Sequence, residues 1–189
     1  ASFQAGVFTD ASCEGDLMAQ SAVSYTLGRE SQKQHGESLA GIRAHTPSHQ
    51  FAVDIPADDE NGKFLPEISA EPKGEAGAAD KRIQAYNFRV IATNVPANRV
   101  PWPKPATYDV KRYELLTRYL TAMTPYMGRP VDSNEVSLLR IIPNGKAGFK
   151  NRGGFSTDYI GKNYDFPDGD YATRERIWKE HEEYQKCFS

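Results

Sequence analysis

The sequence lacks the short motifs that bind nucleotides or metals through a fixed spacing. No GxxxxGK[ST] phosphate-binding loop, HExxH zinc helix or CxxC pair occurs in its 189 residues. The two cysteines, Cys13 and Cys187, stand near opposite ends of the chain, and the four histidines follow no metal-ligand spacing. We therefore expect no metal site. A disulfide between the cysteines stays open, because it depends on whether the two ends meet in space.

A long apolar run and an excess of one charge are also missing. No apolar run approaches the roughly 20 residues that span a bilayer. The 23 basic and 25 acidic residues leave a net charge of −2, so electrostatics gives no reason to expect nucleic acid or a membrane surface as a partner. The first residues, Ala1 to Gly6, do not have the pattern of a signal peptide. The sequence leaves the compartment open.

What is present is the composition of a soluble globular protein, with 39% hydrophobic and 25% charged residues. Val7–Ala11 has the pattern of a short strand, and Leu17–Gln20 that of the first turn of a helix. This is the one strand-turn-helix unit in the chain, whereas a βαβ fold needs several. The polar stretch from Ser31 to Glu75 has little periodicity, which is typical of loops that cover another part of a protein.

Gln84–Thr93 has the clearest strand pattern. Its alternation predicts an apolar face that packs into the core and a second face that carries Asn87 and Arg89. The planar guanidinium of Arg89 could bind a carboxylate or another polar group of a substrate. An ordinary surface salt bridge is the alternative interpretation of the same pattern.

The C-terminal half predicts two helices and a turn. Asp109 is expected to cap a helix that Pro125 ends, with an apolar stripe through Val110, Tyr113, Leu116, Leu120 and Met123. Asn144-Gly145 signals a turn, and the residues 146–154 that follow are expected to form a glycine-rich basic loop able to hold a phosphate. The last helix is expected from about Asp170, with His181 as a hydrogen-bonded packing residue.

These segments together resemble one family, the FAD-dependent oxidoreductases of the class with two dinucleotide-binding folds, including bacterial members described near xanthan lyases. No single segment is specific, but they occur in the family's order over almost the whole chain. The matching stretches are Val7–Ser12, Glu14–Ala19, Val23–Glu30, Gly36–Gly41, Gln84–Arg89, Tyr113–Leu116 and Phe155–Gly161, followed by Asn163–Asp165, Pro167, Tyr171 and Arg174.

The resemblance implies an α+β fold, namely the mixed-sheet substrate or cap region of a flavoprotein. Residues 1–30 would be a residual strand-turn-helix of the FAD-binding domain, and residues 31–189 an incomplete substrate domain. Carried over position by position, the cofactor-binding residues would be Ser12, Glu14, Gly15 and Asp16. Gly15 would allow close approach of the dinucleotide, and Asp16 would accept a hydroxyl hydrogen bond. Asn87 and Arg89 would face a small-molecule substrate, while the resemblance leaves the catalytic residue unknown.

The family's GxGxxG turn is absent from this chain, and that turn holds the pyrophosphate at a helix N-terminus. We therefore expect a fragment of a flavoenzyme for hydride transfer between a small organic substrate and FAD. The isolated chain is expected to bind no FAD and to be inactive, with another chain or segment completing the flavin domain. The alternative is a non-catalytic binding or structural module that has lost flavin.

Overall fold

The computed structural model describes residues 2–188 and has few regular elements for a chain of this length. The helices are α1 (Asp16–Gln20), α2 (Gln32–His35), α3 (Glu114–Met127) and α4 (Tyr171–Phe188). The strands are β1 (Ile91–Thr93), β2 (Ser137–Ile142) and β3 (Lys146–Asn151), in the sheet order β1-β3-β2. Both strand pairings are antiparallel. The expected α+β class is confirmed.

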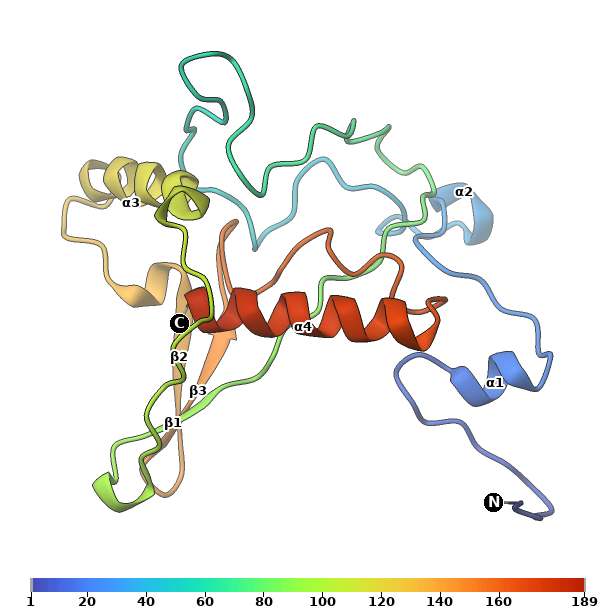
Figure 1. The fold of residues 1–189 in the computed structure, drawn as a ribbon. Coiled ribbons are helices and arrows are strands. Elements are labelled where there is room, and N and C mark those ends of the chain that lie inside the picture. The colour runs from blue at the N-terminus through green and yellow to red at the C-terminus, as the bar shows by residue number, and fades with distance from the viewer. Residues whose placement is uncertain (1, 189) are drawn as a thin grey trace.

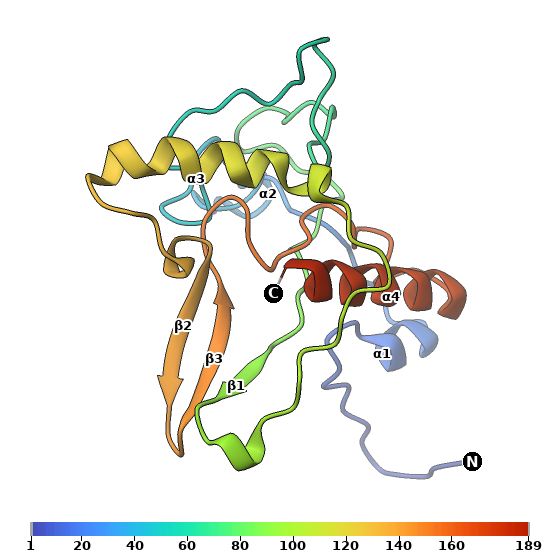
Figure 2. The same cartoon turned by 60° about the vertical axis from the view of Figure 1, so that its left-hand side comes forward.

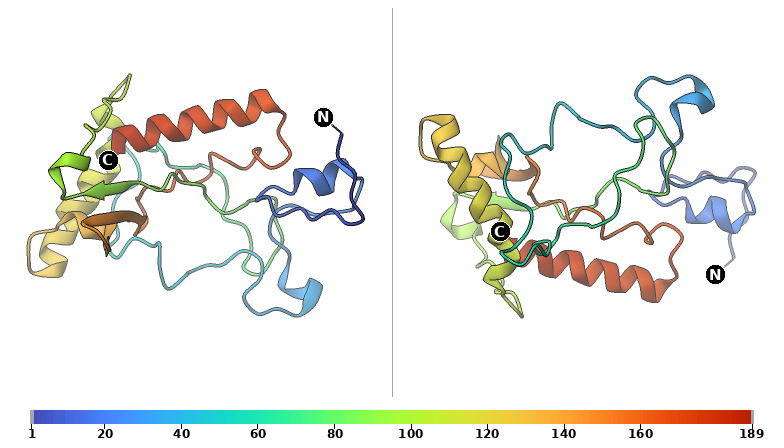
Figure 3. Two further views of the ribbon diagram at one scale, coloured as in Figure 1. Left: turned by 90° about the horizontal axis from the view of Figure 1, so that it is seen from below. Right: turned by 90° about the horizontal axis from the view of Figure 1, so that it is seen from above.

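The longest helix, α4, crosses the middle of the molecule (Figure 1). The sheet and α3 lie near its C-terminal end, whereas α1 lies beside its N-terminal half at the other end of the molecule (Figures 1 and 3). α3 crosses the end of the β2–β3 hairpin that is away from its turn (Figure 2). None of the helices in the described part of the chain is both long and apolar enough to cross a membrane.

The main core joins α3 and α4 with residues of the segments before and between them. Leu65, Tyr113, Leu115 and Phe155 form its buried centre, and Phe188 of α4 packs against them. Burial of side chains of this size provides most of the folding free energy, at roughly 25 cal/mol per Å² of apolar surface removed from water. The core therefore holds the C-terminal end of α4 in place and with it the wall of the site described below.

The long polar stretch is irregular, as the sequence predicts. Apart from the single-turn helix α2, residues 31–75 are held by turns and by isolated bridges, such as Asp58 with Phe64. The Asp59 carboxylate accepts hydrogen bonds from the amides of Asn61 and Lys63, 2.9 Å each. This closes a turn at Gly62, whose φ is 73°, so the acidic side chain here acts on its own backbone.

Two local predictions in the C-terminal half are confirmed. Asn144 and Gly145 have φ values of 64° and 66° and connect β2 to β3, the conformation that favours Asn-Gly in hairpins. α4 begins at Tyr171, and the Asp170 side chain accepts a hydrogen bond of 2.8 Å from the Thr173 amide. Both signals are local, because they depend on the backbone preferences of two or three residues.

Four expectations differ from the structure. No strand forms at Val7–Ala11, because the described residues offer it no partner strand and Val7 is 81% exposed. The strand expected at 84–93 is limited to Ile91–Thr93. Pro125 lies inside α3, which ends at Met127. Residues 146–151 form β3 instead of a basic loop, because the register with β2 uses their backbone groups.

The apolar stripe of α3 is displaced in part: Tyr113 and Met123 are buried as predicted, whereas Val110 is exposed. Asp109 does cap the segment, accepting a hydrogen bond from the Lys111 amide, but the first turn is a 3₁₀ helix, Val110–Tyr113. A 3₁₀ turn has three residues instead of 3.6, so the phase shifts along the helix that follows. In α3 the buried side chains are Leu115, Tyr119 and Met123.

Candidate functional site

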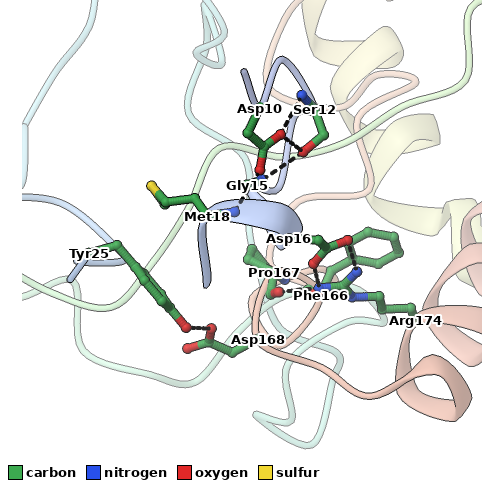
Figure 4. Close-up of polar contacts among 10 residues, drawn as sticks. All are labelled: Asp10, Ser12, Gly15, Asp16, Met18, Tyr25, Phe166, Pro167, Asp168 and Arg174. Atoms are coloured by element: carbon green, nitrogen blue, oxygen red, sulfur yellow. Dashed lines mark hydrogen bonds and ion pairs between the residues drawn. The ribbon is translucent and has the colours of Figure 1, made fainter. Parts of the chain in front are cut away.

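The turn before α1 is closed by the carboxylate of Asp10 (Figure 4). This carboxylate accepts hydrogen bonds from the Ser12 amide at 2.9 Å, the Ser12 hydroxyl at 2.7 Å and the Met18 amide at 3.0 Å. The Gly15 amide donates to the Ser12 hydroxyl oxygen at 3.0 Å, and Gly15 has a φ of 69°, which favours glycine. The Gly15 and Met18 amides are therefore used by the chain itself.

A bidentate ion pair fastens α1 to α4. The Asp16 carboxylate accepts two hydrogen bonds of 2.7 Å from the guanidinium of Arg174. The same guanidinium donates to the carbonyls of Phe166 and Pro167 and lies over the Phe166 ring at 5.6 Å (Figure 4). Arg174 thus uses most of its donors at once, in the geometry that suits arginine better than lysine. This pair positions Cys13 and Glu14, the residues just before α1.

The pKa of Asp10 should show whether the hydrogen bonds that close the turn are formed. The hydrogen bond from the Ser12 hydroxyl, followed by those from the Met18 and Ser12 amides, lowers the pKa of Asp10 from 3.8 to about 2. A lowered pKa in the folded state means that the turn is stabilised above pH 3.8 and loses this contribution as the pH falls through about 2. We expect the NMR shift of the Met18 amide proton to titrate with a midpoint of about 2.

An Asp10→Asn variant is the control, since its Met18 amide should show no transition in this range. A midpoint close to 3.8 in the unmodified chain would mean that the carboxylate is not bonded as described.

A cleft of about 490 Å³ lies between this turn, the segment before β1 and α4. We call it the Asp158 cleft. Its walls come from segments that are far apart in the sequence: Cys13 and Glu14, Gln84–Arg89, Asn151, Asp158, Phe166, and Ile177, Trp178 and His181 of α4. Its volume is in the range of small-molecule sites. Glu14, Asn87 and Arg89, predicted for the cofactor and the substrate, line this one cavity.

Asp158 is held in the cleft by two neutral side chains. Its two carboxylate oxygens each accept a hydrogen bond of 2.5 Å, one from the Asn87 amide group and the other from that of Asn151. Amide donors satisfy part of the carboxylate's hydrogen-bonding capacity but do not neutralise its charge. Asn87 therefore positions a half-buried negative charge, which the strand pattern alone could not indicate.

Aromatic rings form the opposite part of the cleft. Tyr86 packs edge-on against Phe166, with centroids 5.4 Å apart, and Phe88 packs edge-on against Trp178 at 4.8 Å. Burial, followed by the nearby Glu14 carboxylate, raises the pKa of Tyr86. The Glu14 carboxylate is therefore close enough to the Tyr86 ring to act on it electrostatically.

His181 is buried at the wall of the cleft and is only 6% exposed. Its Nδ1 lies 2.8 Å from the carbonyl oxygen of Ile177, so in the neutral ring this nitrogen carries the proton and Nε2 is an acceptor. Burial lowers the pKa of His181. Within residues 2–188, Nε2 has no hydrogen-bond partner, although His181 does pack as predicted, edge-on against Tyr159.

Arg89 is exposed at the cleft, and the structure shows no ion pair or hydrogen bond to its guanidinium among the residues it describes. The surface salt bridge considered for it from the sequence does not form there. In a neighbouring cleft of about 530 Å³, by contrast, a charged side chain does have ion-pair partners. Glu67, which lines it, is paired with Arg112 at 2.6 Å and with Lys162 at 3.6 Å.

The family model for FAD dependent oxidoreductases matches residues 1–189 of the chain. The chain belongs to this family. The comparisons with curated proteins and with solved structures gave no match. The FAD-dependent oxidoreductase family implies FAD as a cofactor.

The turn at α1 does not fit the pyrophosphate of FAD. A dinucleotide fold presents free amides and a positive helix end to the phosphates. Here the Met18 and Gly15 amides are bonded to Asp10 and Ser12, α1 has five residues, and Asp16 places a further negative charge in its first turn. Glu14 is the predicted cofactor residue that lines the cleft, where a hydroxyl group could reach it.

The sequence analysis missed Asp158, Asn151 and Trp178 as site residues. Asp158 lies 71 positions from Asn87 and seven from Asn151, so only the fold brings the three together. The one available signal is the polar pattern of the family-like stretch Phe155–Gly161, which contains Asp158 between two aromatic residues. The predicted roles of Ser12, Glu14, Gly15, Asp16, Asn87 and Arg89 stay predictions.

Proposed function

We propose that this FAD-dependent oxidoreductase chain forms the substrate side of a site that transfers hydride between a small organic substrate and flavin. The observation that carries the proposal is that Glu14, Asn87 and Arg89 line a single cleft. In such enzymes the flavin supplies the redox chemistry, and the protein supplies orientation and polar contacts. Asn87 would act through Asp158, whose carboxylate it holds, and Arg89 would contact the substrate directly.

We further propose that residues 1–30 connect to a flavin-binding part supplied by another segment or chain. Two observations support this. The Gly15 and Met18 amides are already bonded. Val7 and Phe8, which have the sequence pattern of a strand, are 81% and 58% exposed and have no partner strand within the described residues. A single strand gains stability only by pairing, so an external sheet edge would suit this segment. The order of the matching stretches favours the xanthan-lyase-associated type.

The experiment measures FAD retention by the purified 189-residue chain after incubation with excess FAD and desalting. We expect no flavin absorbance and no oxidoreductase turnover, because no glycine turn is present to hold the pyrophosphate. The product of the complete coding region, prepared in parallel, should retain FAD. Stoichiometric FAD on the 189 residues alone would overturn the proposed division of the site.

One observation favours a second candidate, a binding module without flavin. The α1 turn bonds the Gly15 and Met18 amides itself and ties Asp16 to Arg174, contacts that form without a nucleotide. The same experiment separates the two candidates. A colourless, folded product of the complete coding region would support the binding module and contradict the oxidoreductase.

A further inference from the structure

The Asp158 cleft carries more negative charge than its neighbours balance. Asp158 is held by two amide groups and not by a cation. Glu14 is half-buried, and no hydrogen bond or ion pair to its carboxylate occurs in the described part of the chain. Arg174, which interacts with Glu14, is paired with Asp16, so among the residues that line the cleft Arg89 is the one cation set against the two carboxylates. A half-buried charge without a counter-ion is costly, so a bound cation would remove a penalty that the free chain carries.

His181, which lines the cleft, has a buried acceptor. Its Nε2 is without a partner among residues 2–188, and a buried polar atom of this kind costs about 1–3 kcal/mol when nothing satisfies it. An N–H or O–H group of a ligand would satisfy it. Burial favours the neutral ring. A neutral ring can accept such a hydrogen bond and does not repel a cation.

The aromatic wall suits the same ligand. Trp178 meets Phe88 edge-on and is 56% exposed, so part of its indole remains open to the cleft. The faces of aromatic rings attract cations, and tryptophan does so most strongly. A quaternary ammonium ion could lie on the ring but has no N–H group to donate to the carboxylates. An ammonium group that keeps N–H bonds can do both.

Arg89 adds a second requirement. Its guanidinium lines the same cleft, is exposed, and forms no ion pair within the described residues. A purely cationic ligand would be repelled by it, whereas a carboxylate on the same molecule would bind in its planar fork.

We propose that the Asp158 cleft binds an amino acid or a similar zwitterion, with its ammonium group at Asp158, Glu14 and Trp178 and its carboxylate at Arg89. This inference rests on the proposed function only in naming the substrate of that site. The binding it describes needs no flavin.

The test is a fluorescence titration of a Trp102→Phe chain, in which Trp178 is the remaining tryptophan. Three probes differ by one charged group each: L-phenylalanine, 3-phenylpropanoate without the ammonium group, and 2-phenylethylamine without the carboxylate. We expect L-phenylalanine to bind about tenfold or more tightly than either of the others, since a hydrogen bond to a charged group contributes roughly 1.5–3 kcal/mol. Equal affinity for L-phenylalanine and 3-phenylpropanoate, or no saturable signal, would overturn the proposal.

Two variants assign the ends of the ligand. Arg89→Gln should weaken L-phenylalanine, because the carboxylate contact is lost, and should strengthen 2-phenylethylamine, because the repulsion between its ammonium group and the guanidinium is removed. Asp158→Asn should weaken both amines and spare 3-phenylpropanoate. Arg140→Gln, at an exposed position in β2 outside the cleft, is the matched control. If Asp158→Asn fails to fold, Arg89→Gln still decides, since unchanged L-phenylalanine binding would contradict the assignment. FAD retention is measured separately, so either proposal can fail alone.

Discussion

Replacing Tyr184 with alanine is expected to destabilise the chain by about 4 kcal/mol, since removing a large buried aromatic side chain costs roughly 3–5 kcal/mol. Tyr184 is 4% exposed in the last turns of α4. Its ring stacks on Tyr159 at 4.3 Å and on Phe188 at 5.9 Å. The guanidinium of Arg112 lies 5.2 Å from the ring centre. The substitution removes all of these contacts and leaves a cavity.

The loss of folding free energy in Tyr184→Ala should be a large part of the total stability of the chain. Marginal domains have about 5–15 kcal/mol of folding free energy, and this chain has a small core with much irregular backbone. The side chain also anchors the loop that carries Asp158, because its hydroxyl donates a hydrogen bond of 2.6 Å to the Ser156 carbonyl. Loss of Tyr184 should therefore release the Asp158 loop together with the end of α4.

Urea denaturation followed by circular dichroism measures the change. Tyr184→Phe keeps the ring and loses the hydrogen bond to a buried carbonyl, which costs about 1–2 kcal/mol. Tyr171→Ala removes the same side chain from the start of the same helix, where it is 85% exposed, and should change the free energy of unfolding by less than about 0.5 kcal/mol. A Tyr184→Ala loss as small as that at Tyr171 would show that the described core does not hold the chain together.

Sequence analysis was most successful where the signal is local. The Asn144-Gly145 turn follows from the freedom of two residues to adopt positive φ, and the start of α4 follows from a side-chain cap at Asp170. These features depend on neighbours within three or four positions. The α+β class, which the family resemblance implied, is also confirmed, although the strand β3 was expected to be a loop.

Prediction failed where distant segments decide the outcome. Gln84–Val90 has the alternation of a strand, but it forms no strand, and its Gln84 carbonyl and Asn87 side chain bond to the side chains of distant residues. Asn163 donates to the Gln84 carbonyl at 2.8 Å, and Asn87 donates to Asp158. Strand propensity describes a fit to a sheet surface and does not supply the partner strand. The cleft was missed for the same reason, because its residues come from both ends and the middle of the chain.

Replacing Arg174 with alanine should release the first 30 residues from α4 and open the Asp158 cleft. Arg174 donates to both oxygens of Asp16 and to the carbonyls of Phe166 and Pro167. Its side chain is 17% exposed, so water replaces these contacts only after the segment moves. Few buried contacts hold α1 otherwise, since none of its residues is buried. A segment with so few contacts opens locally at low free-energy cost.

Hydrogen exchange followed by mass spectrometry measures this opening. In Arg174→Ala, we expect the amides of Met18 and Ala19 to exchange about tenfold faster or more, because each 1.4 kcal/mol lost from a local opening free energy gives a factor of ten. Peptides from α3 should be unchanged. Arg176→Ala removes an arginine from the same helix whose ion pair with Glu180 is exposed, and it should leave exchange at α1 unaltered.

Arg174→Ala also tests whether the Asp16–Arg174 ion pair supports ligand binding in the Asp158 cleft. Glu14 reaches the cleft because the Asp16–Arg174 pair holds the next turn of the chain against α4. When this pair is lost, Asp158 and Trp178 keep their positions, whereas Glu14 no longer contributes its charge. Affinity for L-phenylalanine and for 2-phenylethylamine should then fall together, while the discrimination between them, which depends on Arg89, should persist. Faster exchange at α1 with unchanged binding of both amines would show that Glu14 takes no part in holding the ammonium group.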